Sequence, residues 1–229
     1  MLNSAKCTEV EATLFPGRDL ITLTQDGFSF QADKQSAQAL MQLQTQAERE
    51  HLTLRVCSAY RSVARQYEIF SAKYHGLRPV LDKDERPLNL KGMSAQEKIQ
   101  AITYFSALPG LSRHHLGTDF DVYALNLLPP GQRLELTCRE YAPGSYFYPL
   151  GQFLKAHSAS CGFIQPFCSP SWKGGREPWH LSYQARADAL LKGFKLETLL
   201  EFYQLFDDEL VAPLVAYART HYRDLLCIS

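Results

Sequence analysis

The spacing of hydrophobic residues divides the first part of the chain into strands and helices. Apolar and polar residues alternate across 20–30 on both sides of Asp26-Gly27, which predicts a β-hairpin with a tight turn. Apolar residues then recur at helical spacing over 35–50, which predicts a helix. The stretch 52–57 alternates and is rich in strand formers, so it predicts another strand.

Polar residues that can cap a helix precede three helical stretches. Asp33 and Ser36 are alternative N-caps for the first of them. Ser62 directly follows the strand ending near residue 57 and is placed to cap a second helix that continues to about residue 74. Ser94 and Glu97 have the spacing of a capping box, which predicts a third helix that continues to about residue 107.

The second half of the chain also contains patterns of both strands and helices. Its patterns predict a strand over 118–124, a helix over 148–161 that ends at Gly162, and a strand over 163–167. Helical spacing returns beyond residue 183. The elements together predict an α+β fold in which a small, mostly antiparallel sheet is covered on one face by helices.

Two segments lack a clear period. Residues 1–19 are predicted to form a lead-in that packs on the body of the protein. Residues 76–93 are rich in charge, glycine and proline, and two interpretations stay open for them. They form either a loop that closes over a substrate or an exposed connection without a role.

The composition restricts the domain count and the partners. A length of 229 residues with 45% hydrophobic content suits one core, so we treat 1–229 as a single domain. Twenty-four basic and twenty-four acidic side chains give a formal charge of zero, which argues against nucleic acid and anionic lipid as partners. No apolar run reaches about eighteen residues, so no membrane span is expected. The oligomeric state stays unknown.

The start of the chain and its cysteines bear on the compartment. The first residues lack the basic region and apolar block of a secretory signal, so we expect the cytoplasm, or the periplasm if a leader has been removed. The six cysteines contain no Cys-x-x-Cys pair, and we expect them to be reduced thiols.

Candidate metal chemistry is concentrated between residues 112 and 121. His114 and Asp121 are separated by seven positions (121 − 114), and Gly117 lies between them, where the chain can turn without a steric penalty. A turn there followed by a strand would bring both side chains toward one point. Imidazole and carboxylate groups bind zinc, and a catalytic zinc has three protein ligands and one position left for water.

The third ligand is expected near the end of the core. His180 follows Glu177 by three residues, and the intervening Pro178 cannot donate to a ladder, which places the glutamate on a loop at the mouth of a strand. Zinc held by His114, Asp121 and His180 leaves Glu177 free to act as the general base for a bound water. The sequence therefore predicts a hydrolase with one Zn²⁺ per chain.

The chain resembles the zinc D-alanyl-D-alanine carboxypeptidases and dipeptidases, including those of vancomycin resistance. Three motifs carry the resemblance in the family's order: Ser58-x-Tyr60-Arg61-Ser62, Ser112-x-His114-x-x-Gly117-x-x-x-Asp121 and Glu177-x-Trp179-His180. The resemblance covers about residues 50–184, which are taken as the zinc peptidase core, with 185–229 as a C-terminal helical extension. It implies a hedgehog/DD-peptidase-like fold.

The resemblance also implies roles for individual residues. It implies that His114, Asp121 and His180 bind zinc, that Glu177 activates water, and that Arg61 stabilises the oxyanion of the tetrahedral intermediate. The candidate substrate contacts are Ser112, Gln66, Tyr60 and Trp179. Trp179 also fits a packing role.

Asp119 departs from the family pattern, which commonly has a small residue two positions before the aspartate ligand. Residues two apart on a strand share a face, so Asp119 is expected to point to the same side as Asp121. Three roles stay open: Asp119 orients a ligand histidine, competes as the ligand, or closes the site as a fourth ligand, for which His115 is the alternative. His115 is otherwise interpreted as a satisfied structural residue that faces away from His114 on a strand.

The predicted function is hydrolysis of the peptide bond next to the C-terminal D-alanine of a peptidoglycan stem peptide. A D-alanyl-D-alanine dipeptidase, an L,D-carboxypeptidase and a peptidoglycan endopeptidase are alternatives with the same site. A zinc-stabilised binding module is the alternative of another class. The presence of both Glu177 and Arg61 favours an enzyme, because a binding module needs neither.

Overall fold

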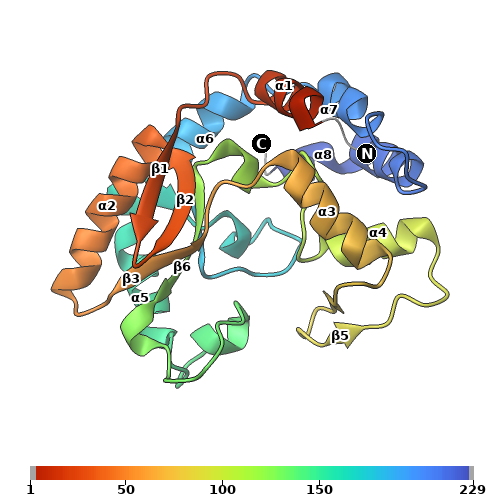
Figure 1. The fold of residues 1–229 in the computed structure, drawn as a ribbon. Helices are drawn as coiled ribbons and strands as arrows, with labels where there is room; N and C mark the ends of the chain where they lie inside the picture. Colours follow the sequence, from red (N-terminus) through yellow and green to blue (C-terminus); the bar gives the residue numbers. More distant parts are fainter. Residues whose placement is uncertain (1–3, 227–229) are drawn as a thin grey trace.

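The computed structural model describes residues 4–226 and confirms the α+β fold class (Figure 1). The α-helices are α1 (Ser4–Leu14), α2 (Lys34–Arg49), α3 (Val63–Tyr74), α4 (Ala95–Thr103), α5 (Tyr148–His157), α6 (Gln184–Leu191), α7 (Leu196–Tyr203) and α8 (Val211–Leu225). The strands are β1 (Leu20–Gln25), β2 (Phe28–Asp33), β3 (Leu54–Ser58), β4 (Val80–Leu81), β5 (Pro87–Leu88), β6 (Asp119–Ala124), β7 (Phe163–Ile164) and β8 (His180–Tyr183). Short 3₁₀ helices are η1 (Arg113–Leu116), η2 (Leu125–Leu127), η3 (Cys138–Tyr141), η4 (Ser158–Cys161) and η5 (Pro166–Cys168).

The central sheet brings together segments that are far apart in the sequence. Its four strands are antiparallel and have the order β3-β6-β8-β7, while β1–β2 and β4–β5 form separate two-stranded sheets. Asp121 on β6 lies opposite His180 on β8 and opposite Ser58 on β3. The sheet register therefore places the central motif between the other two.

The predicted hairpin and the helix after it are confirmed. Asp26 and Gly27 have positive φ angles of 48° and 82°, as a tight primed turn requires. Of the two candidate caps for α2, Asp33 is the N-cap, because its carboxylate accepts a hydrogen bond from the backbone N–H of Gln35 at 3.1 Å. The helix caps at Ser62 and Ser94 also form as predicted.

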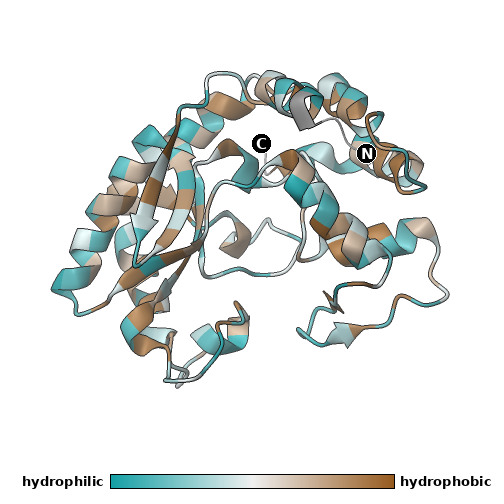
Figure 2. Cartoon of the chain, in the orientation of Figure 1, coloured by the Kyte–Doolittle hydropathy of each residue, from teal (hydrophilic) through white to brown (hydrophobic). Residues whose placement is uncertain are grey.

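Two clusters of buried hydrophobic side chains hold the elements together. One joins α1, α3 and α4 to the C-terminal helices α6, α7 and α8 and includes Leu116. Helices α1 and α7 lie side by side at the top of Figure 1. The other joins the hairpin, α2, α5 and the central sheet and includes Phe120. Figure 2 shows hydrophobic positions along the central strands and mixed positions on α2. The turn between Leu116 and Phe120 thus passes from one cluster to the other.

Helix α1 lies where only a lead-in was expected. Its buried positions include Cys7, Glu11 and Leu14. An acidic residue on the buried face interrupts the apolar period, so the sequence pattern does not show the helix.

Two elements end earlier than predicted. Helix α4 ends at Thr103, and the carbonyl of the next residue, Tyr104, accepts a hydrogen bond from the N–H of Gly175 at 2.7 Å. Strand β7 ends at Ile164, because Pro166 has no N–H to give to a ladder and begins η5 instead.

Two further expectations concern membranes and cysteines. No helix within residues 4–226 is both long enough and apolar enough to cross a bilayer. The described cysteines, Cys7, Cys57, Cys138, Cys161 and Cys168, are free thiols, as expected. Cys227 lies outside the described residues.

Gly117 lies in the turn between the two clusters, where neighbouring atoms leave little room for a side chain. Its φ is +74°, and a Cβ at this position would lie 2.5 Å from Leu20 Cδ2 and 3.1 Å from the backbone nitrogen of Asp33. Gly144 has a φ of +86° but no atom within 4 Å of such a Cβ. We expect urea unfolding to show Gly117→Ala destabilised by about 2–4 kcal/mol and Gly144→Ala by only about 1 kcal/mol. Equal losses of unfolding free energy in the two variants would show that the close approach at Gly117 does not contribute to the destabilisation.

Candidate active site

His114 is held by η1 rather than by a strand. Its Nδ1 donates a hydrogen bond to the carbonyl of Ala59 at 2.8 Å, which leaves the lone pair of Nε2 free. Nε2 lies 3.2 Å from Oδ2 of Asp121. We expected His114 and His115 to face opposite ways because they would be neighbours on a strand. The two residues instead lie on the 3₁₀ helix η1, where their imidazoles still point in different directions.

His180 stands opposite Asp121 across the β6–β8 ladder. Its Nδ1 lies 3.0 Å from Oδ1 of Asp121, and its Nε2 lies 2.9 Å from Oδ1 of Asp119. Burial alone would lower the pKa of His180, but the hydrogen bonds and charges of the two aspartates raise it to about 10. Burial opposes ionisation of Asp121 as well, yet His114 and His180 lower its pKa.

The donor atoms of these residues fit a zinc ion. One ligand atom from each of His114, Asp121 and His180 lies within 4.8 Å of the others, and all three residues are buried. Tetrahedral zinc with ligand bonds near 2.0–2.1 Å separates its ligand atoms by about 3.4 Å, and the histidine–aspartate distances of 3.0 and 3.2 Å are close to this. Both histidines also have their other ring nitrogen engaged by a fixed oxygen, as metal-binding histidines usually do.

Asp119 is the centre of a buried polar network behind the three ligand residues. Its carboxylate accepts hydrogen bonds from Arg113 Nε at 2.9 Å, from Thr118 Oγ1 at 2.6 Å and from Ser182 Oγ at 3.1 Å. Arg113 in turn donates to Ser182 Oγ at 2.6 Å and to the carbonyl of Leu226 at 3.1 Å. Burial opposes ionisation of Asp119, but Arg113 and His180 lower its pKa to about 2.

This network bears on the roles left open for Asp119 and His115. Asp119 contacts the ring nitrogen of His180 that is turned away from Asp121, so the geometry supports orientation of the histidine. His115 donates from Nδ1 to the carbonyl of Arg61 at 2.6 Å and accepts at Nε2 from the N–H of Gly110 at 3.0 Å. With both nitrogens engaged, His115 is not placed to be a fourth ligand.

We expect Asp119→Asn to weaken zinc binding by about 10–100-fold, because the fixed anion that orients His180 is lost. Chelator competition measures the affinity. Thermal unfolding of the metal-free protein separates this effect from the fold destabilisation caused by an uncompensated Arg113. Ser182→Ala removes one neutral hydrogen bond from the same carboxylate and should have a smaller effect on zinc affinity. An unchanged affinity in Asp119→Asn would contradict the orienting role.

Glu177 stands close to the three ligand residues but outside the set. It lies on the loop before β8, as predicted, and its Oε2 is 3.7 Å from Nδ1 of His180. The carboxylate is partly buried, and burial together with the charge of Asp121 raises its pKa to about 7, against the opposing effects of His180 and Arg61. A carboxylate with this pKa can accept a proton and release it again near neutral pH.

Arg61 is mounted at the junction between β3 and α3, as predicted. Its guanidinium donates to Oε1 of Gln66 at 2.8 Å and to Oγ of Ser58 at 3.0 Å. Its backbone is fixed as well, because its N–H donates to the carbonyl of His114 at 3.1 Å and its carbonyl accepts from His115. The side chain therefore has a defined position relative to His114.

A cavity of about 360 Å³, called here the catalytic cleft, joins the candidate residues. Among the sequence-predicted residues, those that line it are Arg61, Gln66, Ser112, His114, Asp121, Glu177, Trp179 and His180. The amide of Gln66 is engaged at both ends, by Arg61 and by the carbonyl of Ala107 at 2.7 Å, so it holds the arginine in place. Trp179 is 4% exposed and also packs on Tyr141, so it has both a packing and a lining position.

Tyr60 lies outside the catalytic cleft, contrary to the substrate contact implied by the resemblance. Its hydroxyl bonds instead to Glu11 of α1 at 2.6 Å. The same carboxylate accepts from Arg18 at 3.0 Å and from the first N–H of α3, at Val63, at 2.9 Å. Glu11 thus ties α1 to both sides of Arg61, and the resemblance, which begins near residue 50, gave no signal for it.

Aromatic residues of the cleft were also missed from the sequence. The ring of Phe167 lies 4.5 Å from the ring of His180, centroid to centroid, and Trp172 packs on Phe167 at 4.8 Å. Both line the cleft. Phe167 was expected on a strand, and its actual place on η5 is what turns the ring toward His180.

The 76–93 segment reaches across the catalytic cleft. Glu85, between β4 and β5, accepts a hydrogen bond from the N–H of Cys138 at 2.5 Å and lies 3.7 Å from Arg139. Arg139 also donates to the carbonyl of Asp84 at 2.6 Å. Leu81 and Glu85 line the cleft. The segment is therefore more than an exposed connection, because two of its residues form part of the cleft wall.

The chain is similar to known proteins in sequence and in structure. Residues 29–186 match the family described as VanY, D-alanyl-D-alanine carboxypeptidase. An uncharacterized protein of Haemophilus influenzae is 42% identical over 90 residues, which are 38% of this chain and 69% of that protein.

Two solved structures have the same fold at low identity. VanYB in complex with D-alanine-D-alanine is 23% identical with a TM-score of 0.51, and the match covers 81% of this chain and 91% of that chain. A Glu-to-Ala mutant of the vancomycin resistance D,D-pentapeptidase VanY in complex with Zn(II) is 24% identical with a TM-score of 0.50, covering 81% and 90%. The family match spans more than half of the chain and agrees with the resemblance in the three motifs. This protein therefore belongs to the VanY family of D-alanyl-D-alanine carboxypeptidases and is a metallopeptidase of that type.

Proposed function

We propose that the protein is a zinc-dependent carboxypeptidase that hydrolyses the peptide bond next to the C-terminal D-alanine of a peptidoglycan stem peptide. The observation that carries the proposal is the position of Glu177. Its carboxylate lies 3.7 Å from His180 Nδ1, beside a three-ligand set, and shares one cleft with Arg61. A three-ligand site with an adjacent unligated carboxylate is the arrangement of a hydrolytic metal centre.

The metal would be held by Nε2 of His114, a carboxylate oxygen of Asp121 and Nδ1 of His180. Bound zinc polarises the scissile carbonyl and lowers the pKa of water. Nε2 of His180 contacts Asp119 and Nδ1 of His114 contacts the carbonyl of Ala59, so the other nitrogen of each ring is the one left to face a metal.

Glu177 supplies the proton transfers. Its carboxylate takes a proton from the attacking water and then gives it to the leaving amine of D-alanine. The same group must be a base first and an acid afterwards, and burial beside Asp121, which raises the pKa of Glu177, favours the second role.

Arg61 supplies positive charge for the tetrahedral intermediate. Its guanidinium is already held by Ser58 and Gln66, so little reorganisation is needed when the negative charge develops on the oxygen. Ser112 and Trp179, which line the cleft, are the proposed contacts for the D-alanine end of the substrate.

A panel of defined substrates tests the proposal and its alternatives. The panel contains a stem pentapeptide ending in D-Ala-D-Ala, the tetrapeptide produced from it, free D-alanyl-D-alanine and a cross-linked dimer. We expect mass spectrometry to show loss of one alanine from the pentapeptide as the main reaction, abolished by a chelator and restored by zinc.

The other outcomes identify the alternatives. Cleavage of the tetrapeptide would indicate an L,D-carboxypeptidase, preferred cleavage of the free dipeptide a dipeptidase, and division of the dimer an endopeptidase. No turnover of any substrate by the zinc-loaded protein would refute the proposal and favour a binding module.

A further inference from the structure

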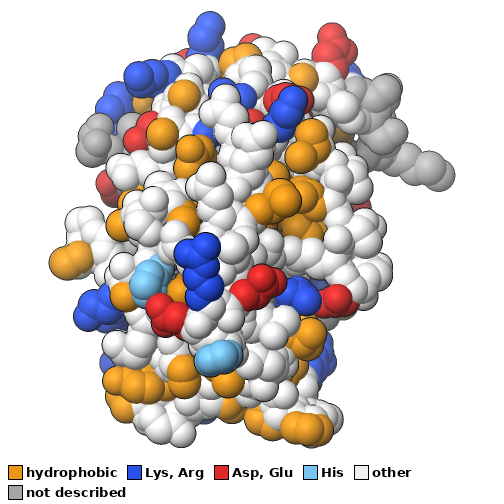
Figure 3. Space-filling view, turned by 90° about the vertical axis from the view of Figure 1, so that its left-hand side faces the viewer, with side chains coloured by type: hydrophobic (Ala, Val, Ile, Leu, Met, Phe, Trp, Pro, Cys, Tyr) orange, Lys and Arg blue, Asp and Glu red, His pale blue; other side chains and the backbone are white. Residues whose placement is uncertain are grey.

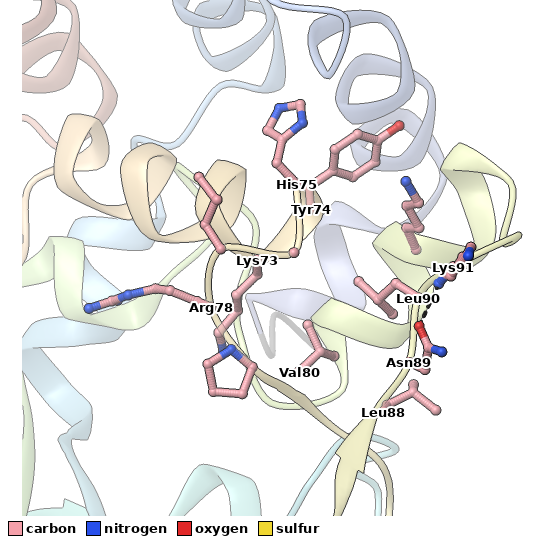
Figure 4. A pocket seen from close by; sticks show the side chains of 13 residues that line it. Lys73, Tyr74, His75, Arg78, Val80, Leu88, Asn89, Leu90 and Lys91 are labelled. Atoms are coloured by element: carbon pink, nitrogen blue, oxygen red, sulfur yellow. Dashed lines mark hydrogen bonds between the residues drawn. The ribbon is translucent and has the colours of Figure 1, made fainter.

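A second cavity, of about 590 Å³, lies between α3, the β4–β5 hairpin and the start of α4. We call it the basic groove, because four cationic side chains line it: Lys73, Arg78, Lys91 and Lys98. Figure 4 shows Arg78 and Lys91 on opposite sides, with the apolar side chains of Val80 and Leu88 between them. The groove therefore combines an apolar floor with positively charged walls.

The charge of Glu177 acts on Lys73, and Asp208 and Glu209 lie 3.8 and 3.9 Å from His75, but, in the part of the chain that the structure describes, acidic side chains do not form part of the basic groove itself. No carboxylate lines it, and none of its four cations forms a salt bridge within residues 4–226. The chain as a whole has a formal charge of zero. Figure 3 shows acidic and basic side chains interspersed on another face of the molecule. The excess of positive charge in the groove is therefore local and does not follow from the composition of the chain.

Part of the groove is held in place. Lys98 Nζ lies 4.7 Å from the centroid of the Tyr74 ring, and Lys73 Nζ donates to Ser106 Oγ. Burial, with repulsion from Arg78 and Arg61, lowers the pKa of Lys73 to about 8. An anion in the groove would relieve that repulsion.

The basic groove adjoins the catalytic cleft. Lys73 and Arg78 line both cavities. A carboxypeptidase substrate has a single residue on the leaving side of the scissile bond, so only its acyl side is long enough to extend into a second cavity. Each extended residue adds about 3.3–3.6 Å, so every further residue on the acyl side extends the substrate by that length beyond the scissile bond.

We infer that the basic groove binds carboxylate groups which the substrate carries on the acyl side of the scissile bond, so that the enzyme prefers acidic peptides. This inference rests on the proposed carboxypeptidase function. The groove selects by charge and the catalytic cleft by the terminal D-alanine, which makes the two sites separable by mutation.

Two matched peptides and one surface lysine test the inference. The peptides end in D-Ala-D-Ala and differ only in whether the upstream side groups are carboxylates or amides. Lys91→Glu reverses a charge in the groove at an exposed position outside the catalytic cleft, and Lys155→Glu on α5 is the matched control outside both cavities. We expect Lys91→Glu to lower kcat/KM for the acidic peptide by about 3–10-fold and to leave the amide peptide within about twofold. Lys155→Glu should change neither.

Binding to the metal-free protein gives a readout that does not need turnover. The acidic peptide should bind more tightly than the amide peptide by calorimetry, less so in Lys91→Glu and at high salt. Equal losses for both peptides, or no loss for either, would overturn the inference. If neither peptide is cleaved but the Lys91-dependent preference for the acidic peptide persists in binding, the groove assignment holds and the proposed carboxypeptidase function fails.

Discussion

Replacing Glu177 by glutamine is expected to lower kcat by about 10²–10⁴-fold while zinc stays bound. Glutamine has the shape of glutamate but cannot accept the proton from water. Glu177 is not one of the three ligand residues, so its loss leaves the donors of His114, Asp121 and His180 in place. Steady-state kinetics on the pentapeptide and zinc content by mass spectrometry measure the two parts of this prediction.

Glu135→Gln is the matched control for Glu177→Gln. Glu135 also lines the catalytic cleft, but it is exposed and is not part of the three-ligand cluster. We expect its substitution to change kcat by no more than about twofold, because no proton transfer depends on it. Hydrolysis that survives in Glu177→Gln at the wild-type rate would remove this residue from the mechanism. Loss of zinc in that variant would make it a ligand instead.

The second large effect is expected for Arg61→Ala, with a fall in kcat of about 10²–10³-fold. The guanidinium acts on charge that develops only in the transition state, so kcat should fall more than KM rises. Arg61→Lys should recover little of the rate. A lysine cannot keep the paired contacts to Ser58 and Gln66, which depend on the planar fork of arginine.

Arg65→Ala controls for the removal of positive charge near the N-terminus of α3. Arg65 is exposed, and within residues 4–226 its one salt bridge is to Glu68, at 2.5 Å, so its loss should change kcat by no more than about twofold. A loss in Arg61→Ala that appears only in KM would indicate a substrate contact rather than stabilisation of the intermediate.

The ligand residues could be predicted because their signals are local. Gly117 allows the chain to turn, a strand pattern follows it, and His180 begins another strand. Once the two strands pair, these features fix the direction of each donor atom. Asp121 and His180 are directly opposite on β6 and β8, a pairing that places both side chains on one face of the sheet. The alternation of side chains along a strand predicted that Asp119 shares a face with Asp121, but not which side of His180 it would contact.

Residues that act through distant partners could not be predicted in this way. Glu11 contacts Val63, which is 52 positions away in the sequence. The sequence alone does not distinguish a buried acidic residue in α1 from an exposed one. Tyr60 was assigned to the substrate because its motif is next to Arg61, although its hydroxyl turns toward α1. The basic groove depends on β4 and β5, which are too short to produce a periodic pattern.

The hydrogen bond from Arg113 to the carbonyl of Leu226 ties the order of biosynthesis to the maturation of the metal centre. A ribosome makes Leu226 46 residues after His180, the last of the three donors (226 − 180), so all three donors are synthesised before the acceptor that steadies Arg113. A nascent chain paused before α8 would hold Asp119 by fewer restraints. The restraint that Arg113 places on Asp119, and through it on His180, is therefore complete only once Leu226 is in place at the end of α8.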